Sequence, residues 1–361
     1  MGPVLGSEVT TRTGGAMPTL LLLAPFCDEH VDALREAAGP GWVIERHWPA
    51  DMSTPKAMCS GRYDLSDDEL VAALERADAV IGEPALPLLR RAADEGSRLR
   101  LVQATWAGTD RYTRGDVAFP AGVSLCSAVG GFGQLISQYV VAQVLGLMQN
   151  LPAYRDRQRG ASWEDLGAVG SLDGARVLVF GAGNIGGWVA RRLRGFDCTV
   201  TGVCRDPSRP REGFDRLVTL DDAEAELAGA DVVVGALPNT RSTAGWLDGR
   251  RLRLMGPGAV LVNVGRGSFV DSNALAEVLA EGAIRGAALD VTAPEPLPAG
   301  HPLWQEPRCF ITPHVSGGSF GRHRQTEDNI CAICCDNLRA LAAGGPLRNL
   351  VPASAFEVAP R

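Results

Sequence analysis

The chain has 361 residues, of which 45% are apolar and 21% are charged, and its net charge is -7 at pH 7. This length favours two domains over a single core. The longest apolar runs, 19–26 and 140–148, are shorter than the roughly 18 residues that a membrane span needs. The mild acidity and scattered basic residues argue against nucleic acid as a main partner. Since no secretion signal opens the chain, we expect a cytoplasmic protein with a small-molecule partner.

Nine cysteines are scattered along the chain. An odd number of cysteines without a signal peptide predicts reduced thiols rather than a disulfide framework. Only Cys331, Cys334 and Cys335 cluster, at the i, i+3, i+4 spacing of one helix face. A tetrahedral zinc site needs a fourth ligand, and the neighbouring sequence supplies none. We therefore expect a buried helix face and no metal site.

The first third of the chain alternates between strand and helix patterns. Residues 1–16 are rich in Gly, Thr and Ser, so we expect a disordered tail. Helices are predicted over 30–38 and over 66–76, the second with Ser66 as its N-cap. Short apolar runs predict strands over 19–24, 42–46, 79–82 and 99–103. This alternation is typical of a parallel sheet built from βαβ units.

The alternation restarts after a long helix, which is predicted over 134–151 and is expected to end at Pro152. A last helix is predicted over 322–343 and ends at Gly344. Between them, six apolar runs predict strands over 175–180, 199–203, 231–236, 259–264, 286–291 and 309–311. We therefore predict an α/β protein with a second doubly wound sheet.

A glycine-rich motif, G-x-G-x-x-G, follows the predicted strand 175–180 and opens a helix predicted over 187–194. In this context the motif predicts a dinucleotide-binding loop, because its glycines permit a tight turn, close approach of the pyrophosphate and close packing of the helix. The N–H groups at the start of the helix then bind phosphate. The expected contacts are Gly181, Gly183, Asn184, Ile185 and Gly186.

The choice between NAD and NADP depends on the end of the next strand, where an acidic residue binds the ribose hydroxyls of NAD. Cys204 occupies that position and Arg205 follows it. An uncharged residue followed by arginine favours the 2′-phosphate of NADP, and Arg209 and Arg211 add positive charge nearby. Asp206 is the counter-evidence. We prefer NADP and keep NAD as the alternative.

Five further motifs occur in order along the second half of the chain. They lie at 237–240 (LPNT), 263–267 (NVGRG), 288–291 (ALDV), 295–297 (EPL) and 312–314 (TPH). Together they resemble the D-isomer-specific 2-hydroxyacid dehydrogenase family. The resemblance implies a Rossmann NAD(P)-binding domain and a flavodoxin-like substrate domain, with the active site in the cleft between them.

The same resemblance implies the catalytic groups. Arg266 anchors the carboxylate of a 2-keto acid, since its planar fork matches a carboxylate. His314 donates the proton to the carbonyl oxygen, because imidazole titrates near neutral pH. Glu295 orients the imidazole and favours its charged form. Asp290 matches the residue that holds the nicotinamide carboxamide.

Other expected contacts rest on the resemblance alone. The loop 105–110 resembles the one whose backbone N–H groups receive the substrate carboxylate, so Trp106, Ala107 and Gly108 are expected to bind substrate. Trp106 stands where the family more often has a small residue, and it either narrows the pocket or fills the core. The remaining expected cofactor contacts are Leu237, Pro238, Thr243, Val264 and Gly317.

The implied domains are a substrate-binding domain over 17–121, completed by 322–361, and a nucleotide-binding domain over 122–321. Within the latter, 134–165 resembles the arm through which these enzymes form homodimers. The alternative is an apolar helix buried in its own domain.

We therefore expect an NAD(P)-dependent oxidoreductase that moves a hydride between the cofactor and a small 2-keto or D-2-hydroxy acid. The segments 131–133 and 204–205 resemble the glyoxylate/hydroxypyruvate reductase branch. One alternative is a reductase of a bulkier or phosphonate-containing 2-keto acid. Another is a nucleotide-sensing binding protein like the corepressors that share the fold.

Overall fold

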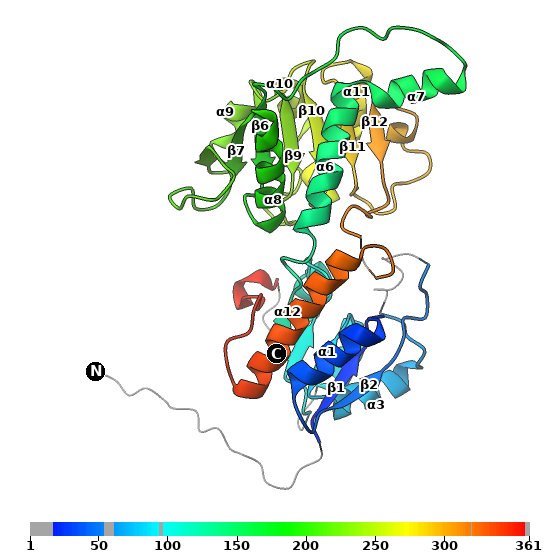
Figure 1. The fold of residues 1–361 in the computed structure, drawn as a ribbon, viewed down its shortest axis with the longest axis vertical. Helices are drawn as coiled ribbons and strands as arrows, with labels where there is room; N and C mark the ends of the chain where they lie inside the picture. Colours follow the sequence, from blue (N-terminus) through cyan, green and yellow to red (C-terminus); the bar gives the residue numbers. More distant parts are fainter. Residues whose placement is uncertain (1–16, 54–60, 94–96, 319, 358–361) are drawn as a thin grey trace. The chain divides into compact units, whose positions relative to one another are not determined.

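A computed structural model describes residues 17–53, 61–93, 97–318 and 320–357 (Figure 1). The described chain forms two compact units. The first comprises the residues up to Thr105, Arg111–Ser127 and those from Cys331 onward, and the second comprises Trp106–Asp110 and Ala128–Ile330. The predicted tail, 1–16, lies outside the described residues.

These bounds differ from the predicted domain boundaries in three places. Residues 122–127 belong to the first unit, because the strand Ser124–Cys126 pairs with Leu101–Gln103. Residues 322–330 belong to the second unit. The expected substrate loop, 105–110, is divided: Thr105 belongs to the first unit, and Trp106–Asp110 group with the second unit, where Asp110 pairs with Arg266.

The first unit contains a five-stranded parallel sheet in the order β2-β1-β3-β4-β5. This is the flavodoxin-like strand order, which confirms the fold predicted for this part of the chain. Its strands are β1 (Thr19–Leu22), β2 (Val43–Arg46), β3 (Ala79–Ile81), β4 (Leu101–Gln103) and β5 (Ser124–Cys126). Its helices are α1 (Asp28–Ala38), α3 (Asp67–Arg76), α4 (Leu86–Ala92) and most of α5 (Asp110–Thr113) and α12 (Arg324–Ala343).

Two local predictions are confirmed in this unit. The Ser66 hydroxyl accepts a hydrogen bond from the Glu69 N–H, and the Glu69 side chain returns to the Ser66 N–H, so a capping box begins α3. Cys331, Cys334 and Cys335 are buried along α12. Burial raises the pKa of the Cys334 thiol well above its ordinary value.

The second unit contains a seven-stranded parallel sheet in the order β12-β11-β10-β9-β6-β7-β8. Counted from β6, this is the Rossmann order extended by one strand, as the glycine motif predicted. Its strands are β6 (Arg176–Phe180), β7 (Thr199–Val203), β8 (Arg216–Val218), β9 (Val232–Gly235), β10 (Val260–Asn263), β11 (Gly286–Leu289) and β12 (Cys309–Ile311). Its helices include α8 (Asn184–Leu193), α9 (Ala223–Leu227), α10 (Gly249–Leu254) and α11 (Ser272–Ala280).

The long helix predicted to end at Pro152 is two helices. α6 (Gly133–Met148) ends before Asn150, which has a left-handed φ of 56°, and α7 (Leu151–Arg159) then begins. Pro152 lies in the first turn of α7, where its missing N–H costs no helical hydrogen bond. The prediction that proline ends this helix is therefore wrong. In Figure 1, α6 lies across the sheet of its own unit beside α8, and α7 leads away from it.

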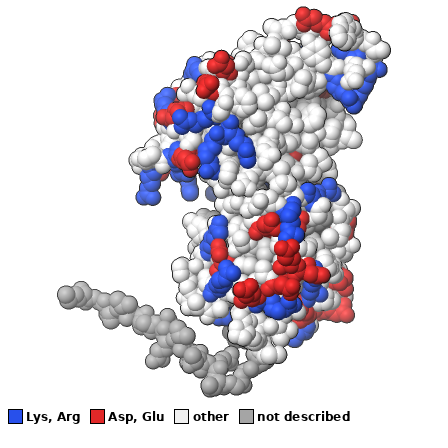
Figure 2. Space-filling view, in the orientation of Figure 1, with Lys and Arg blue, Asp and Glu red and all other residues white. Residues whose placement is uncertain are grey.

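No helix among the described residues combines the length and the hydropathy that crossing a bilayer would require. On the face drawn in Figure 2, basic side chains lie next to acidic ones over both units. Pairs of this kind include Arg250–Glu224 and Arg253–Glu281.

Candidate active site

The glycine loop joins β6 to α8 and is shaped by close backbone contacts. Gly181 has a φ of +107°, and a Cβ there would lie 2.6 Å from the Ala236 carbonyl oxygen. A Cβ at Gly186 would lie 2.0 Å from the Gly181 carbonyl oxygen, so both positions require glycine. A Cβ at Gly183 would meet nothing within 4 Å, which leaves open space above the loop.

The start of α8 leaves donors available for a phosphate. The helix begins at Asn184 rather than at the predicted residue 187, so Asn184 and Ile185 lie in its first turn. Gly183 is the N-cap, and no side chain caps the first N–H groups. An uncapped N-terminus beside open space fits a dinucleotide pyrophosphate.

The loop after β7 brings several charges near the glycine loop. Arg211 donates a hydrogen bond from Nη1 to the Ala182 carbonyl oxygen at 2.7 Å. Arg209 pairs with Asp206 at 3.4 Å, and Arg205 is exposed. Hydrogen bonds from the side chain and the backbone N–H of Ser208 lower the pKa of Asp206. The sequence names Arg211 only as additional positive charge, after Arg205. In the structure, Arg211 forms the hydrogen bond to the glycine loop.

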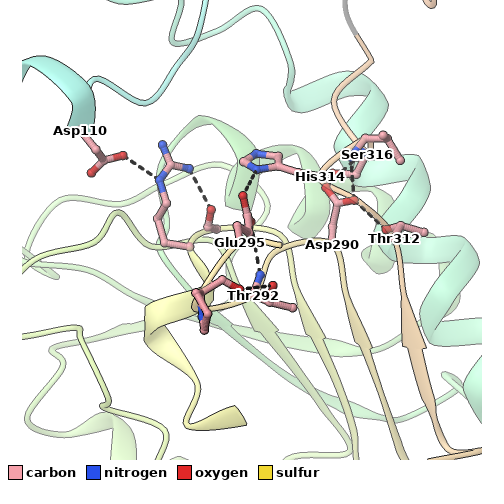
Figure 3. A network of polar contacts seen from close by, with 11 residues as sticks. Asp110, Asp290, Thr292, Glu295, Thr312, His314 and Ser316 are labelled. Carbon is pink, nitrogen blue, oxygen red and sulfur yellow. Dashed lines mark hydrogen bonds and ion pairs between the residues drawn. The ribbon is translucent and has the colours of Figure 1, made fainter. Parts of the chain in front are cut away.

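Arg266 leaves the sheet just after β10, and Asn263 fixes its backbone. The Asn263 side chain donates to the Arg266 carbonyl oxygen at 3.1 Å and accepts from the Gly265 N–H at 3.2 Å. The guanidinium donates from Nε to Asp110 Oδ2 at 2.8 Å and from Nη1 to the Gly265 carbonyl oxygen at 2.9 Å. Figure 3 shows Asp110 at one side of this network.

His314 and Glu295 form the second part of the site. The imidazole Nδ1 lies 3.2 Å from Glu295 Oε2, and the two side chains are 31% and 28% exposed (Figure 3). The other oxygen of Glu295 accepts a hydrogen bond from the Thr292 N–H at 3.3 Å. The Trp106 ring meets the imidazole edge to face at 5.7 Å between centroids. A partly exposed imidazole held by a carboxylate is suited to proton transfer.

The chain resembles known proteins over both units. A family model described as the NAD-binding domain of D-isomer specific 2-hydroxyacid dehydrogenases matches residues 141–316. Glyoxylate/hydroxypyruvate reductase A of Serratia proteamaculans is 32% identical over 252 residues, which cover 68% of this chain and 78% of that protein. The crystal structure of a D-isomer specific 2-hydroxyacid dehydrogenase family protein from Aeromonas salmonicida has 33% identity and a TM-score of 0.77 over 93% of this chain and 99% of that one. The chain belongs to the D-isomer-specific 2-hydroxyacid dehydrogenase family.

Another solved structure of this family holds ligands. The D-isomer specific 2-hydroxyacid dehydrogenase from Xanthobacter autotrophicus Py2, in complex with NADPH and MES, has 27% identity and a TM-score of 0.73. The match covers 94% of this chain and 98% of that one. The predicted family, its fold class and an oxidoreductase acting on CH–OH groups are therefore confirmed.

The other residues expected to contact the cofactor in this family member follow the ends of the strands. Leu237 and Pro238 come after β9, and Val264 comes directly after β10. Thr243 is buried and donates to the Pro238 carbonyl oxygen at 2.8 Å, which folds the loop back on itself. A Cβ at Gly317 would lie 3.0 Å from the Phe132 ring. Their contacts with a cofactor stay predictions.

The sequence indicates a substrate loop over 105–110 but does not predict two contacts that this loop makes. Asp110 holds the Nε of Arg266, and Trp106 packs against the imidazole of His314. Trp106 is thus part of the site's wall as well as a ring packed against Phe132 at 6.3 Å. Gly108 lies against the guanidinium, since a Cβ there would come within 1.4 Å of Arg266 Nη2. Ala107 lies between Trp106 and Gly108 in the chain.

The Gly108 contact yields a test. We expect Gly108→Ala to displace the guanidinium and lower kcat/KM for a 2-keto acid by about 100-fold, the loss that a misplacement of about 1 Å causes. The melting temperature should hold, because the new methyl group meets only the end of a flexible side chain. Steady-state kinetics and thermal unfolding measure the two effects.

The matched control is Gly258→Ala, where a Cβ meets nothing within 4 Å. Wild-type kinetics in Gly108→Ala would contradict the placement of Arg266 at the substrate.

Proposed function

We propose that the chain is an NAD(P)-dependent reductase of small 2-keto acids, of the glyoxylate or hydroxypyruvate type. The observation that carries this proposal is the His314–Glu295 pair, which lies in the same unit as Arg266 and the glycine loop. The printed activity of the Serratia relative supports the substrate class.

The residues of the site divide the reaction among them. The Nη groups of Arg266 bind the substrate carboxylate, while Asp110 holds Nε and fixes the plane of the guanidinium. The backbone N–H groups of the 106–108 loop complete the carboxylate site. His314 donates its proton to the carbonyl oxygen, and Glu295 orients the imidazole.

The cofactor supplies a hydride when it is bound. His314 gives its proton to the carbonyl oxygen of the keto acid, and with the hydride on carbon 2 the product would be a 2-hydroxy acid. Arg266 stabilises the negative charge that develops on the oxygen before the proton arrives. The reverse reaction uses the same groups with neutral His314 as the base.

Trp106 favours a small substrate over a bulky or phosphonate-containing one. Its ring stands edge to face against the imidazole and so fills space beside the reacting carbonyl. We therefore propose that Trp106 limits the size of the substituent on carbon 2.

NADP is the proposed cofactor, with NAD as the alternative. Arg205 is free of the ion pair that engages Arg209, and Arg211 adds charge at the glycine loop. The NADPH bound by the Xanthobacter relative supports this choice.

We also propose a cytoplasmic homodimer formed through the arm 134–165. No side chain of α7 is buried. Its apolar residue Leu151 is 56% exposed, and Trp163, which follows the helix, is fully exposed. A hollow of about 650 Å³ lies between α7 and residues 161–165. A second copy of the chain would cover the exposed Leu151 and Trp163 side chains.

A panel of 2-keto acids with NADPH and NADH, followed by the loss of nicotinamide absorbance, tests the proposed function. We expect turnover of glyoxylate and hydroxypyruvate with NADPH, and weaker turnover of branched or phosphonate-bearing keto acids. Nucleotide binding without turnover of any keto acid would favour the corepressor-like alternative.

Cofactor choice is tested at Arg205. We expect Arg205→Ala to raise the KM for NADPH by about tenfold or more, since a charge-assisted hydrogen bond contributes roughly 1.5–3 kcal/mol. The KM for NADH should stay the same. Arg209→Ala is the control, because Asp206 already pairs with that guanidinium. A wild-type enzyme that prefers NADH would defeat the NADP assignment.

The two reaction directions should respond to pH in opposite ways. Reduction needs protonated His314 and oxidation needs the neutral form, so kcat/KM falls with rising pH for reduction and rises for oxidation. His314→Gln should lower both by roughly 10²- to 10⁴-fold and abolish the opposing slopes. Profiles measured in both directions decide this, and parallel slopes in the wild type would exclude His314 as the proton donor.

The homodimer is tested at the arm. Trp163→Glu places a charge on the proposed interface, so sedimentation velocity should show a shift from dimer to monomer. Val117→Glu is the control, since Val117 is an exposed apolar residue outside the arm. A dimer unaffected by Trp163→Glu would place the interface elsewhere.

A further inference from the structure

Asp290 forms hydrogen bonds with four of the five residues of the segment 312–316, which carries the proposed proton donor. It follows β11 and is 2% exposed. Its Oδ1 accepts hydrogen bonds from the Thr312 hydroxyl at 2.7 Å and the Val315 N–H at 2.9 Å. Its Oδ2 accepts from the N–H and the hydroxyl of Ser316, at 3.1 and 2.5 Å. Its backbone carbonyl accepts from the His314 N–H at 2.8 Å. One residue therefore fixes the segment 312–316 from both ends (Figure 3).

His314 needs such support because of its backbone conformation. Its φ is +56°, in the left-handed region that side chains other than glycine adopt at a cost. A strained residue persists only where its surroundings hold it. Here the hydrogen bonds to Asp290 hold the residues on both sides, and the imidazole is thereby presented to Glu295 at 3.2 Å.

We propose that Asp290 is a positioning residue for the proton donor: it fixes the 312–316 segment so that His314 stays against Glu295. This inference rests on the proposed function of His314. It differs from the carboxamide contact that the family resemblance implies, because it assigns Asp290 an effect on proton transfer that does not depend on cofactor affinity.

The geometry predicts that asparagine does not reproduce the contacts of this aspartate. Each oxygen of Asp290 accepts from a backbone N–H, that of Val315 on one side and that of Ser316 on the other. An amide has one oxygen and one NH₂ group, so in either orientation a donor would face a backbone donor. Asp290→Asn therefore keeps the size of the side chain but should lose a hydrogen bond to the backbone of the segment 312–316.

The experiment compares Asp290→Asn with Ser316→Ala, which removes one donor hydroxyl and keeps every backbone N–H. The matched control is Asp271→Asn, since Asp271 also accepts backbone N–H groups, from Asn273 and Ala274 at the start of α11. NADPH affinity is measured by fluorescence titration. Steady-state reduction of glyoxylate gives kcat and KM, and deuterated NADPH gives the isotope effect on hydride transfer.

Asp290→Asn should lower kcat by about 100-fold, as expected for a displaced catalytic group. This loss of kcat should persist at saturating NADPH, whatever the Kd for NADPH, and the KM for glyoxylate should stay at its wild-type value. The isotope effect should increase, because a misplaced acid makes the chemical step limiting. Ser316→Ala should move kcat and the isotope effect in the same direction by less. If Asp290→Asn does not fold, the kcat and the isotope effect of Ser316→Ala decide the proposal instead.

A weaker Kd for NADPH at unchanged kcat would overturn the proposal in favour of the carboxamide contact. A lower melting temperature with an unchanged isotope effect would also overturn it, since it indicates a purely structural role. Histidine ¹⁵N spectra separate this failure from that of the proposed function, because they need no substrate. The His314 resonance is identified as the one that is lost in His314→Gln. Both Asp290→Asn and Glu295→Gln should shift this resonance. An unshifted His314 resonance in Asp290→Asn would refute the positioning role of Asp290, even if the protein turned over no keto acid.

Discussion

Five neighbouring parallel strands of the second unit, β12, β11, β10, β9 and β6, end at one edge of their sheet. The backbone leaves each strand there with a group of the candidate site: His314, Asp290, Arg266, the 237–238 segment and the glycine loop 181–186. The pairing of the strands sets how far apart these exits lie. Side-chain hydrogen bonds then orient each group. The arrangement of the site therefore depends on the register of the sheet, as in other open α/β folds.

The sequence predicts strands where a run of mostly apolar residues marks them. The runs 199–203 and 309–311 coincide with β7 and β12. β5 and β8 escape prediction because each has only three residues, one of them polar or charged (Ser124 in β5 and Arg216 in β8), so neither forms an apolar run. The break between α6 and α7 escapes it for another reason. Proline is compatible with the first turn of a helix, so Pro152 alone does not distinguish an end from a beginning.

The motifs predict which residue types the site contains, and less about what holds them. Arg266, Glu295 and His314 belong to short motifs whose chemistry is readable from the chain. The hydrogen bond between Arg266 and Asp110 joins residues 156 positions apart, so no local sequence pattern predicts it. Asp290 is visible as a motif residue, but its ties to the 312–316 segment depend on the neighbouring strand β12. Contacts through space complete a site that local sequence only outlines.

The partial exposure of the His314–Glu295 pair bears on how the site is reset after each turnover. A proton that leaves with the alcohol product has to be replaced before the next keto acid reacts. If His314 is the proton donor, as we propose, its 31% exposed side chain lets solvent or buffer return that proton in one transfer. In the proposed mechanism, recharging the acid therefore needs no chain of side chains through the interior.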